Sequence, residues 1–320
     1  MASAAGKKLN NDGDILLDVR NLTVRYDVGK AMLGKPRGRI HAVEDASFRI
    51  NAGETLALVG ESGCGKSTIG KTLLGLTRPL RGEVLFEGKR ISGLGRSSLK
   101  PVRRNLQMIF QDAFASLNPR MRVGEAIGEP LVIHRIERGG ALSMRVQALM
   151  HRVGLDSAHL KRYPHQLSGG QRQRVCIARA IALNPRLIVA DEAVSALDVT
   201  IKSKIINLLL DLQREMGLAY LFISHDMAVV ERISHRVAVM YLGRIVEIGS
   251  RRQVFEQPAH EYTRKLLDAV PVADPKARRP LTHLETEEIP SPLRPAGYEP
   301  EPARYREVTP GHLVAVDGTG

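Results

Sequence analysis

Cysteine, aromatic side chains and long apolar runs are all scarce in this chain of 320 residues. Its two cysteines, Cys64 and Cys176, are too few for a disulfide framework or a metal site of the usual spacing, which favours a reducing compartment. The longest apolar runs fall far short of the ~18 residues that a membrane-spanning helix requires. Residues 1–14 contain two lysines followed by polar and acidic residues, without the apolar core of a secretion signal. We therefore expect a protein that does not span a bilayer and stays inside the cell.

Acidic residues are outnumbered, since 47 Lys and Arg against 34 Asp and Glu leave a formal net charge of +13. Three explanations are open, namely a solvated basic surface, contact with anionic lipid, or nucleic-acid binding. The denser groups, around Lys100 and around Lys276, lack interleaved aromatic residues, which make up only 4% of the chain. This pattern favours the solvated surface and disfavours nucleic acid, but the charge alone does not decide the function.

Apolar periodicity divides the chain into regions. Residues 15–58 have the alternation of antiparallel strands, and a buried strand at 55–59 precedes a helix that starts near Ser67. Periodic segments between 112 and 183 are nearly all helical, whereas strands resume at 187–190, 219–224 and 237–241. We expect an α/β domain over 15–270 with a helical subdomain at about 112–183.

The carboxyl-terminal tail differs in composition from the rest of the chain. Nine of the seventeen prolines lie from Pro271 onward, together with several glutamates. Such a composition buries little apolar surface. The sequence therefore predicts a Pro-rich extension over 271–320 without a packed core of its own.

Residues 60–68 match the phosphate-loop pattern G-x-x-x-x-G-K-[ST], and they lie between an apolar strand and a helix, as that pattern requires. The glycines allow backbone N–H groups to surround phosphate oxygens, and the helix start adds its positive dipole end. Lys66 would reach the β- and γ-phosphates of ATP, and the Ser67 hydroxyl would coordinate Mg²⁺. A flexible turn before an ordinary helix is the alternative, and Cys64 is expected to fill space rather than act as a redox switch. The residues expected to bind ATP are Gly60, Ser62, Gly63, Cys64, Gly65, Lys66, Ser67 and Thr68.

Two adjacent carboxylates, Asp191 and Glu192, follow the buried strand at 187–190. Ligands of parallel sheets bind at the carboxyl ends of the strands. We expect Asp191 to hold Mg²⁺ through a water molecule and Glu192 to orient the attacking water or accept its proton. A strand that runs into an acidic loop is commonplace, so these roles depend on the phosphate loop that precedes them.

A second potential anion site lies at residues 167–171, with the sequence Leu-Ser-Gly-Gly-Gln. Ser168 is a good helix N-cap, and the two glycines expose N–H groups at a helix start. Two phosphate-binding helix starts about a hundred residues apart do not suit one nucleotide in one chain, but they suit two chains that close head to tail. A glycine-rich cap without a ligand is the alternative. The residues expected to contact the ATP of a partner are Ser168, Gly169, Gly170 and Gln171.

The phosphate loop, residues 167–171, the Asp191-Glu192 strand and residues 195–198 together resemble the ATP-binding cassette family over roughly 15–270. The resemblance implies a P-loop NTPase cassette with a mixed core sheet, an antiparallel β subdomain and an α-helical subdomain. It also implies roles for single residues, although a polar strand end, a structural histidine and core packing are the alternatives for the first three. Gln111 would sense Mg²⁺ and the attacking water, and His225 would contact the γ-phosphate. Tyr26 would stack on the adenine, and Asp198 would couple the two sites across a dimer.

Within that family the chain most resembles ATPase subunits of bacterial dipeptide and oligopeptide importers, a group that also includes nickel and glutathione importers. Residues 111–119, 193–198 and 260–271 carry the likeness, and the extended region at 27–41 fits it. The resemblance implies ATP hydrolysis that powers transport through two separate permease subunits, with an extracytoplasmic solute-binding protein. The partner cassette would be a paralogue or a second copy, and the location would be the cytoplasmic face of the inner membrane.

Two departures from the family pattern accompany this resemblance. Ala193 stands where a proline usually follows the catalytic glutamate, which removes a rigid φ, although we expect activity to survive. The tail lacks the cysteines that some members use for an iron–sulfur cluster, so ATP and Mg²⁺ are the expected cofactors.

Two rival functions belong to other classes. A soluble cassette ATPase that acts on DNA or ribosomes is disfavoured because neither long coiled coils nor a second cassette is present. A nucleotide-binding regulator without turnover is disfavoured by the intact Lys66, Asp191, Glu192 and His225.

Overall fold

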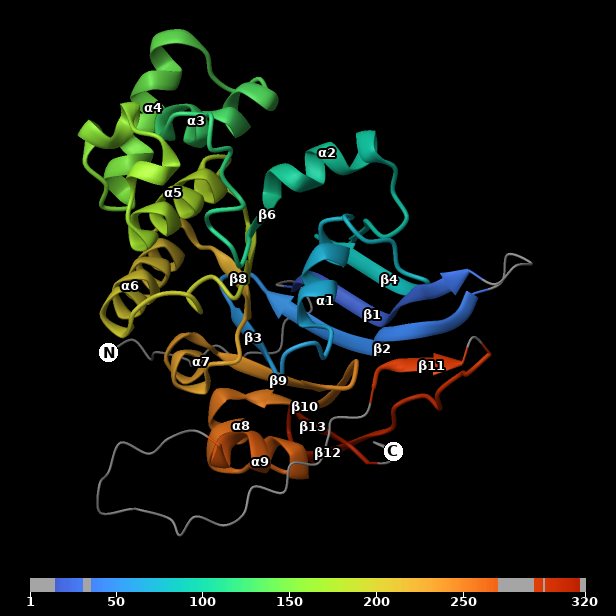
Figure 1. Cartoon of the computed structure of the whole chain (residues 1–320). Coiled ribbons are helices and arrows are strands. Elements are labelled where there is room, and N and C mark those ends of the chain that lie inside the picture. Colours follow the sequence, from blue (N-terminus) through green and yellow to red (C-terminus); the bar gives the residue numbers. More distant parts are fainter. Residues whose placement is uncertain (1–14, 31–35, 270–290, 296, 317–320) are drawn as a thin grey trace, which may run out of the picture.

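The computed structural model describes residues 15–30, 36–269, 291–295 and 297–316. Residues 1–14, which are expected to lack a secretion signal, lie outside these ranges. So do residues 271–290, the first part of the Pro-rich tail. Two sheets lie next to each other, helices pack mainly on the larger one, and one helical lobe projects beyond the sheets (Figure 1). The expected α/β architecture, with a mixed core sheet, an antiparallel β subdomain and helices, is confirmed.

The smaller sheet is antiparallel and has the order β11-β2-β1-β4-β5. The sequence alternation over 15–58 did not show where the long hairpin of this sheet, formed by two strands of 16 residues each, begins and ends. The reason is that residues 26–29 are exposed, so the hairpin continues without the apolar alternation that would predict it. The strands of this sheet are β1 (Ile15–Lys30), β2 (Pro36–Asn51), β4 (Arg81–Phe86), β5 (Lys89–Arg90) and β11 (Leu293–Pro295).

The core sheet has the order β12-β13-β10-β9-β3-β8-β7-β6. Its central strands pair in parallel, whereas β10, β13 and β12 are added antiparallel to one another and to β9. Because helices cover both faces at the centre, these strands are continuous apolar runs. The bounds are β3 (Thr55–Val59), β6 (Leu106–Ile109), β7 (Leu187–Asp191), β8 (Ala219–Ile223), β9 (Arg236–Tyr241), β10 (Arg244–Ser250), β12 (Tyr305–Thr309) and β13 (His312–Ala315).

Side chains of β7 alternate between two apolar cores. Leu187 and Val189 pack in the core that contains Ile69 of the helix after β3, whereas Ile188 and Ala190 pack in the core of the helical lobe. The carboxyl end of β7 therefore lies between the phosphate-loop helix and the lobe, where a ligand would touch both.

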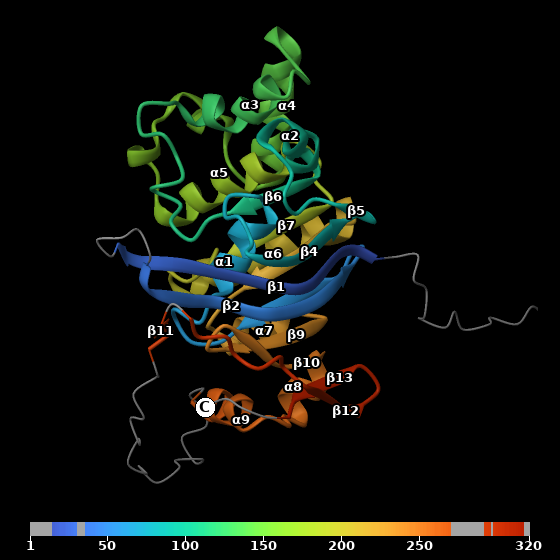
Figure 2. The same cartoon turned by 90° about the vertical axis from the view of Figure 1, so that its right-hand side faces the viewer.

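The helices begin with α1 after the phosphate loop, and α3 to α5 form the lobe at the top of Figures 1 and 2. In the described part of the chain, no helix is both long enough and apolar enough to cross a bilayer. The helical segments are α1 (Lys66–Leu73), α2 (Arg96–Asn105), α3 (Val123–Ile133), α4 (Gly139–Arg152), η2 (Ser157–Lys161), η3 (Pro164–Gln166), α5 (Gly169–Ile181), α6 (Val199–Met216), α7 (Met227–Ile233), α8 (Arg251–Glu256) and α9 (Glu261–Asp268).

The described part of the tail is attached to both sheets. Strand β11 pairs with β2, and β13 pairs with β10. Glu299 also forms an ion pair with Arg25 of β1, at 2.8 Å. The tail thus extends existing sheets, and the expected domain division at residue 270, which borders the undescribed segment, stays a prediction.

Candidate functional site

The phosphate loop connects β3 to α1 and requires glycine at two positions. Gly60 and Gly65 have φ of +143° and +106°. A Cβ atom would lie 2.1 Å from the Met240 carbonyl oxygen at Gly60 and 2.0 Å from the Ala42 carbonyl oxygen at Gly65. Any side chain would displace backbone there, so the loop passes this narrow gap only with glycine.

Lys66 is turned into the loop that it follows. Its side chain is buried, and Nζ donates hydrogen bonds to the carbonyl oxygens of Gly60, at 2.8 Å, and Glu61, at 2.6 Å. The Cys64 thiol lies 3.6 Å from the same nitrogen, and burial raises its pKa. A buried, protonated thiol is a poor nucleophile, which agrees with the expectation that Cys64 fills space.

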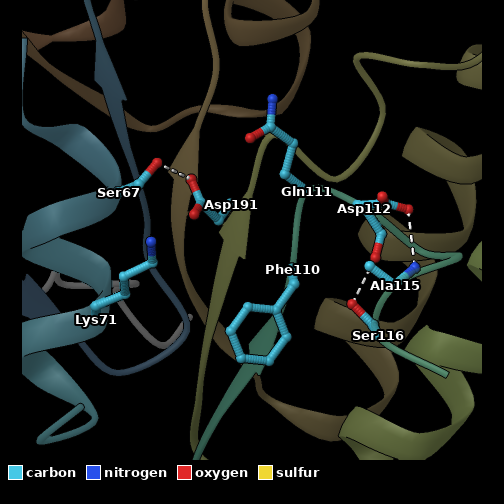
Figure 3. A pocket seen from close by; sticks show the side chains of 8 residues that line it. All are labelled: Ser67, Lys71, Phe110, Gln111, Asp112, Ala115, Ser116 and Asp191. Carbon is cyan, nitrogen blue, oxygen red and sulfur yellow. Dashed lines mark hydrogen bonds between the residues drawn. The ribbon is translucent and has the colours of Figure 1, made fainter. Parts of the chain in front are cut away.

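Ser67 and Asp191, expected from the sequence to hold Mg²⁺, are in direct contact. The Ser67 hydroxyl donates a hydrogen bond of 2.8 Å to Asp191 Oδ1 (Figure 3). Burial is the main reason why the pKa of Asp191 is raised, and the nearby Glu192 carboxylate adds to it, whereas the Ser67 bond acts in the opposite direction. A buried carboxylate that is penalised in this way is suited to a cation.

The Glu192 carboxylate lies close to Gln111 and His225, the other two residues that were expected to be catalytic. Gln111 Nε2 donates a hydrogen bond of 2.7 Å to Glu192 Oε2. His225 Nδ1 lies 3.4 Å from Glu192 Oε1, on the opposite oxygen. The three side chains come from the carboxyl ends of β6, β7 and β8, which lie next to one another in the core sheet.

The backbone of Glu192 has an unusual conformation for a residue with a side chain, with φ of +46°. Its N–H group donates to the Ile223 carbonyl oxygen at 3.0 Å, and its own carbonyl oxygen accepts from the Ser195 hydroxyl at 3.0 Å. Strained backbone of this kind persists only where neighbours hold it. These bonds constrain Glu192 although alanine occupies the position after it.

A pocket of about 380 Å³ lies between α1 and the loop after β6, with Ser67, Gln111 and Asp191 on its wall. Figure 3 shows α1 on one side and the loop on the other. Sequence reasoning missed several lining residues, although Lys71 follows Ser67 by one helical turn and could have been found by that spacing. The lining residues without an earlier assigned role are Lys71, Phe110, Asp112, Ala115 and Ser116.

The loop after Gln111 is fastened to α5. Arg179 Nη1 donates to the Ser116 carbonyl oxygen at 2.8 Å, and the Arg172 guanidinium lies 5.1 Å from the centroid of the Phe114 ring. The loop therefore connects α5, the helix that Ser168 caps, to the cluster of Glu192, Gln111 and His225, called the Glu192 cluster below.

Ser168 caps α5 as expected. Its hydroxyl accepts from the Gln171 N–H at 3.3 Å, while its own N–H donates to Gln171 Oε1 at 3.0 Å. Gly170 is packed closely, since a Cβ atom there would lie 2.6 Å from Ile201 Cγ2. Within the described residues, no hydrogen bond or ion pair joins this helix start to residues 60–68.

Two further predicted site residues also lie apart from the Glu192 cluster. Tyr26 is exposed on β1, opposite Ile40 of β2. Asp198 is exposed at the N-cap of α6. The structure does not bring either into contact with the phosphate loop, so their roles stay predictions.

The oxygen donors at the site fit a magnesium ion. The Ser67 hydroxyl, the Asp191 carboxylate and the Gln111 amide line one pocket, and Mg²⁺ is usually held by one or two such groups together with phosphate oxygens. A resident transition-metal centre would need a different set of ligands. In the described part of the chain, no group of three or more His, Cys, Asp or Glu residues could form one.

Two family models match the chain. One, described as "ABC transporter", matches residues 43–195, and the other, described as "Oligopeptide/dipeptide transporter, C-terminal region", matches residues 246–297. Two curated relatives are both called "Glutathione import ATP-binding protein GsiA". The one from Salmonella paratyphi A is 58% identical to this chain and the one from Escherichia coli K12 is 57% identical, each over 304 residues, or 95% of this chain. The chain spans about half the length of these relatives, 49% of each.

Two solved structures have a similar fold. A dimeric ATP-binding cassette, MJ0796, bound to ADP and Pi, matches with 30% identity and a TM-score of 0.66, over 74% of this chain and 99% of that chain. The cbiO1 protein from Clostridium perfringens, part of the cbiONQ transporter complex, matches with 28% identity and a TM-score of 0.65, over 76% of this chain and 92% of that one.

Proposed function

The chain belongs to the ATP-binding cassette family, and from that premise we propose that it binds MgATP on residues 60–68 and hydrolyses it with Glu192 as catalytic base. The observation that carries the proposal is the convergence of Gln111 and His225 on the two carboxylate oxygens of Glu192. The Glu192 carboxylate would accept the proton of the attacking water, and Gln111 would orient that water. His225 would contact the γ-phosphate from the other side.

The remaining residues of the site would bind and neutralise the triphosphate. Lys66 would exchange its loop carbonyls for phosphate oxygens, and Ser67 and Asp191 would hold the magnesium ion, Asp191 through water. The bound ion would supply positive charge for the β- and γ-phosphates. Tyr26 would stack on the adenine.

The site would be completed by a second cassette. The helix start at Ser168–Gln171 is not joined to its own phosphate loop, and it presents backbone N–H groups of the kind that bind phosphate. Two cassettes that close head to tail would place each helix start on the other's nucleotide, and Asp198 would couple the two sites. The partner would be a paralogue or a second copy, and the similar cassette MJ0796 is dimeric.

We further propose that the chain powers a bacterial importer for dipeptides or oligopeptides, at the cytoplasmic face of the inner membrane. The C-terminal match and the names of the relatives support a cargo of the peptide class, with the tripeptide glutathione as the first candidate and nickel as the alternative. The proposed partners are two permease subunits and an extracytoplasmic solute-binding protein. No nucleic acid is involved.

The test is reconstitution of this chain with the permeases encoded beside its gene, followed by measurements of ATP hydrolysis and of uptake of labelled glutathione, a dipeptide and Ni²⁺. We expect peptide-stimulated hydrolysis, which Glu192→Gln lowers by about a hundredfold or more while ATP binding persists. Turnover of Glu192→Gln at the wild-type rate would refute the catalytic assignment. Tight, salt-sensitive binding of nucleic acid without associated membrane proteins would instead favour a soluble cassette.

A further inference from the structure

A tyrosine from the C-terminal part of the chain reaches the phosphate loop. The Tyr262 hydroxyl, on α9, accepts a hydrogen bond of 3.0 Å from the N–H group of Glu61, which lies 201 positions earlier in the sequence. The tyrosine is 8% exposed, and its ring lies against Tyr241 with 4.3 Å between centroids. Tyr262 therefore reaches the loop from the region that matches the oligopeptide transporter model.

The contact acts on the same loop residue that Lys66 holds. The N–H group of Glu61 is bound by Tyr262, and the carbonyl oxygen of Glu61 accepts from Lys66 Nζ at 2.6 Å. Two successive peptide groups of the loop are thus fixed from outside and from inside. The start of the loop cannot reorient without breaking one of these bonds.

The helix that carries Tyr262 is itself held by a buried carboxylate. Glu247 of β10 is 0% exposed and accepts from the backbone N–H groups of Ala259, at 3.0 Å, and His260, at 2.9 Å. These residues directly precede α9, and His260 Nδ1 then caps the helix by accepting from the Tyr262 N–H at 3.1 Å. The position of Tyr262 follows from that of Glu247.

The same carboxylate also binds the tail. His312 of β13, which is buried, has Nε2 2.7 Å from Glu247 Oε1. One buried group therefore connects the tail strand, the start of α9 and, through Tyr262, the phosphate loop. Since a buried carboxylate must have its partners, loss of His312 would disturb all three.

We propose that Tyr262 is a positioning residue of the phosphate loop, and that Glu247 and His312 make its position depend on the C-terminal tail. The inference rests on the proposed ATPase function, since the consequence of an ordered loop is tighter ATP binding. Tyr262 touches no phosphate, so it acts through the Glu61 amide. A purely structural aromatic residue would fill space without fixing the Glu61 amide.

The test uses the full chain with Tyr262→Phe, which removes the hydroxyl and keeps the ring. Tyr241→Phe is the matched control, because it removes a hydroxyl from the neighbouring ring that does not bind the loop. Amide hydrogen exchange is measured at Glu61, and the Kd for ATP with Mg²⁺ is measured by calorimetry. The KM and kcat for ATP are measured in the complex with the permeases, and the Tm is measured for each variant.

We expect Tyr262→Phe to speed exchange at Glu61 and to raise the Kd and KM by about two- to tenfold, the range of one hydrogen bond. The kcat at saturating ATP should stay within about twofold, and Tyr241→Phe should leave exchange, Kd and KM as in the wild type. Unchanged exchange and Kd in Tyr262→Phe would overturn the proposal. So would a lower Tm with an unchanged KM, which is the result for a merely structural ring.

A second variant, His312→Ala, tests the connection to the tail without altering Tyr262. Faster exchange at Glu61 supports that connection, and wild-type exchange overturns it. If the wild-type chain binds no ATP, the proposed function fails, but the exchange of the Glu61 amide in Tyr262→Phe still decides whether Tyr262 positions the loop.

Discussion

The amide of Gln111 donates a 2.7 Å hydrogen bond to the carboxylate of Glu192, across a separation of 81 residues. The bond joins the loop that connects the sheet to the helical lobe with the proposed catalytic base. Arg179 fastens the same loop to α5 through the Ser116 carbonyl oxygen. A displacement of the lobe would therefore also shift Gln111 relative to Glu192.

Gln111→Ala should lower the kcat for ATP by about tenfold to a hundredfold, because the base and the attacking water lose a group that orients them. The Kd for ATP should change less than the kcat, since Lys66, Ser67 and Asp191 remain to bind the phosphates and the magnesium ion. Steady-state hydrolysis and ATP titration of the purified complex separate these effects. A weakened affinity with an unchanged kcat would contradict an orienting role.

Gly65→Ala should abolish ATP binding, because the added Cβ atom would lie 2.0 Å from the Ala42 carbonyl oxygen. Gly53→Ala is the control for backbone strain. Gly53 also has a positive φ, +72°, but no atom lies within 4 Å of the position of its Cβ. ATP titration should distinguish the two variants. Equal affinity for ATP would show that the loop has room that the structure does not indicate.

Asp191→Asn should raise the thermal stability at neutral pH while it removes hydrolysis. Burial raises the pKa of Asp191, so the folded state binds this proton more tightly than the unfolded state does. The free energy of unfolding of the wild type should therefore fall as pH rises from the ordinary pKa of an aspartate through the raised value, and then level off.

The asparagine variant should lack this contribution, so the melting curves of the two proteins, recorded from acidic to neutral pH, should diverge as pH rises. A wild-type protein that gained stability relative to Asp191→Asn over that range would contradict the direction of the shift. Added MgATP should reduce the difference at high pH.

Arg25→Ala should destabilise the protein by about 3 kcal/mol, because it leaves the buried Glu44 carboxylate without its guanidinium partner at 2.7 Å and with only His41 Nδ1 at 2.8 Å. Arg39→Ala is the matched control on the neighbouring strand, where the Arg39–Asp27 pair is more exposed to solvent than the Arg25–Glu44 pair and should contribute less than about 1 kcal/mol. Urea unfolding measures both. Since Arg25 also binds Glu299, its loss should in addition release that segment of the tail, which limited proteolysis would detect.

Much of the site was accessible from local sequence. The phosphate loop, the buried strand before Asp191 and the serine cap of α5 each depend on neighbouring residues, because glycine conformation, apolar burial and N-capping act over a few positions. The extent of the β1–β2 hairpin was not accessible, since its exposed end has no apolar alternation. Its pairing with β11 was not accessible either, since it depends on residues more than two hundred positions away.

The sequence by itself determined the local chemistry of nucleotide binding and the α/β class, because both follow from the order of residue types along the chain. Only the tertiary structure decided which distant groups meet. It places Gln111 and His225 on the two oxygens of Glu192, and it places the Tyr262 hydroxyl on the Glu61 amide. These contacts depend on which strands are neighbours in the core sheet and on where α9 packs. Long-range packing of the cores fixes that arrangement, and short stretches of sequence do not encode it.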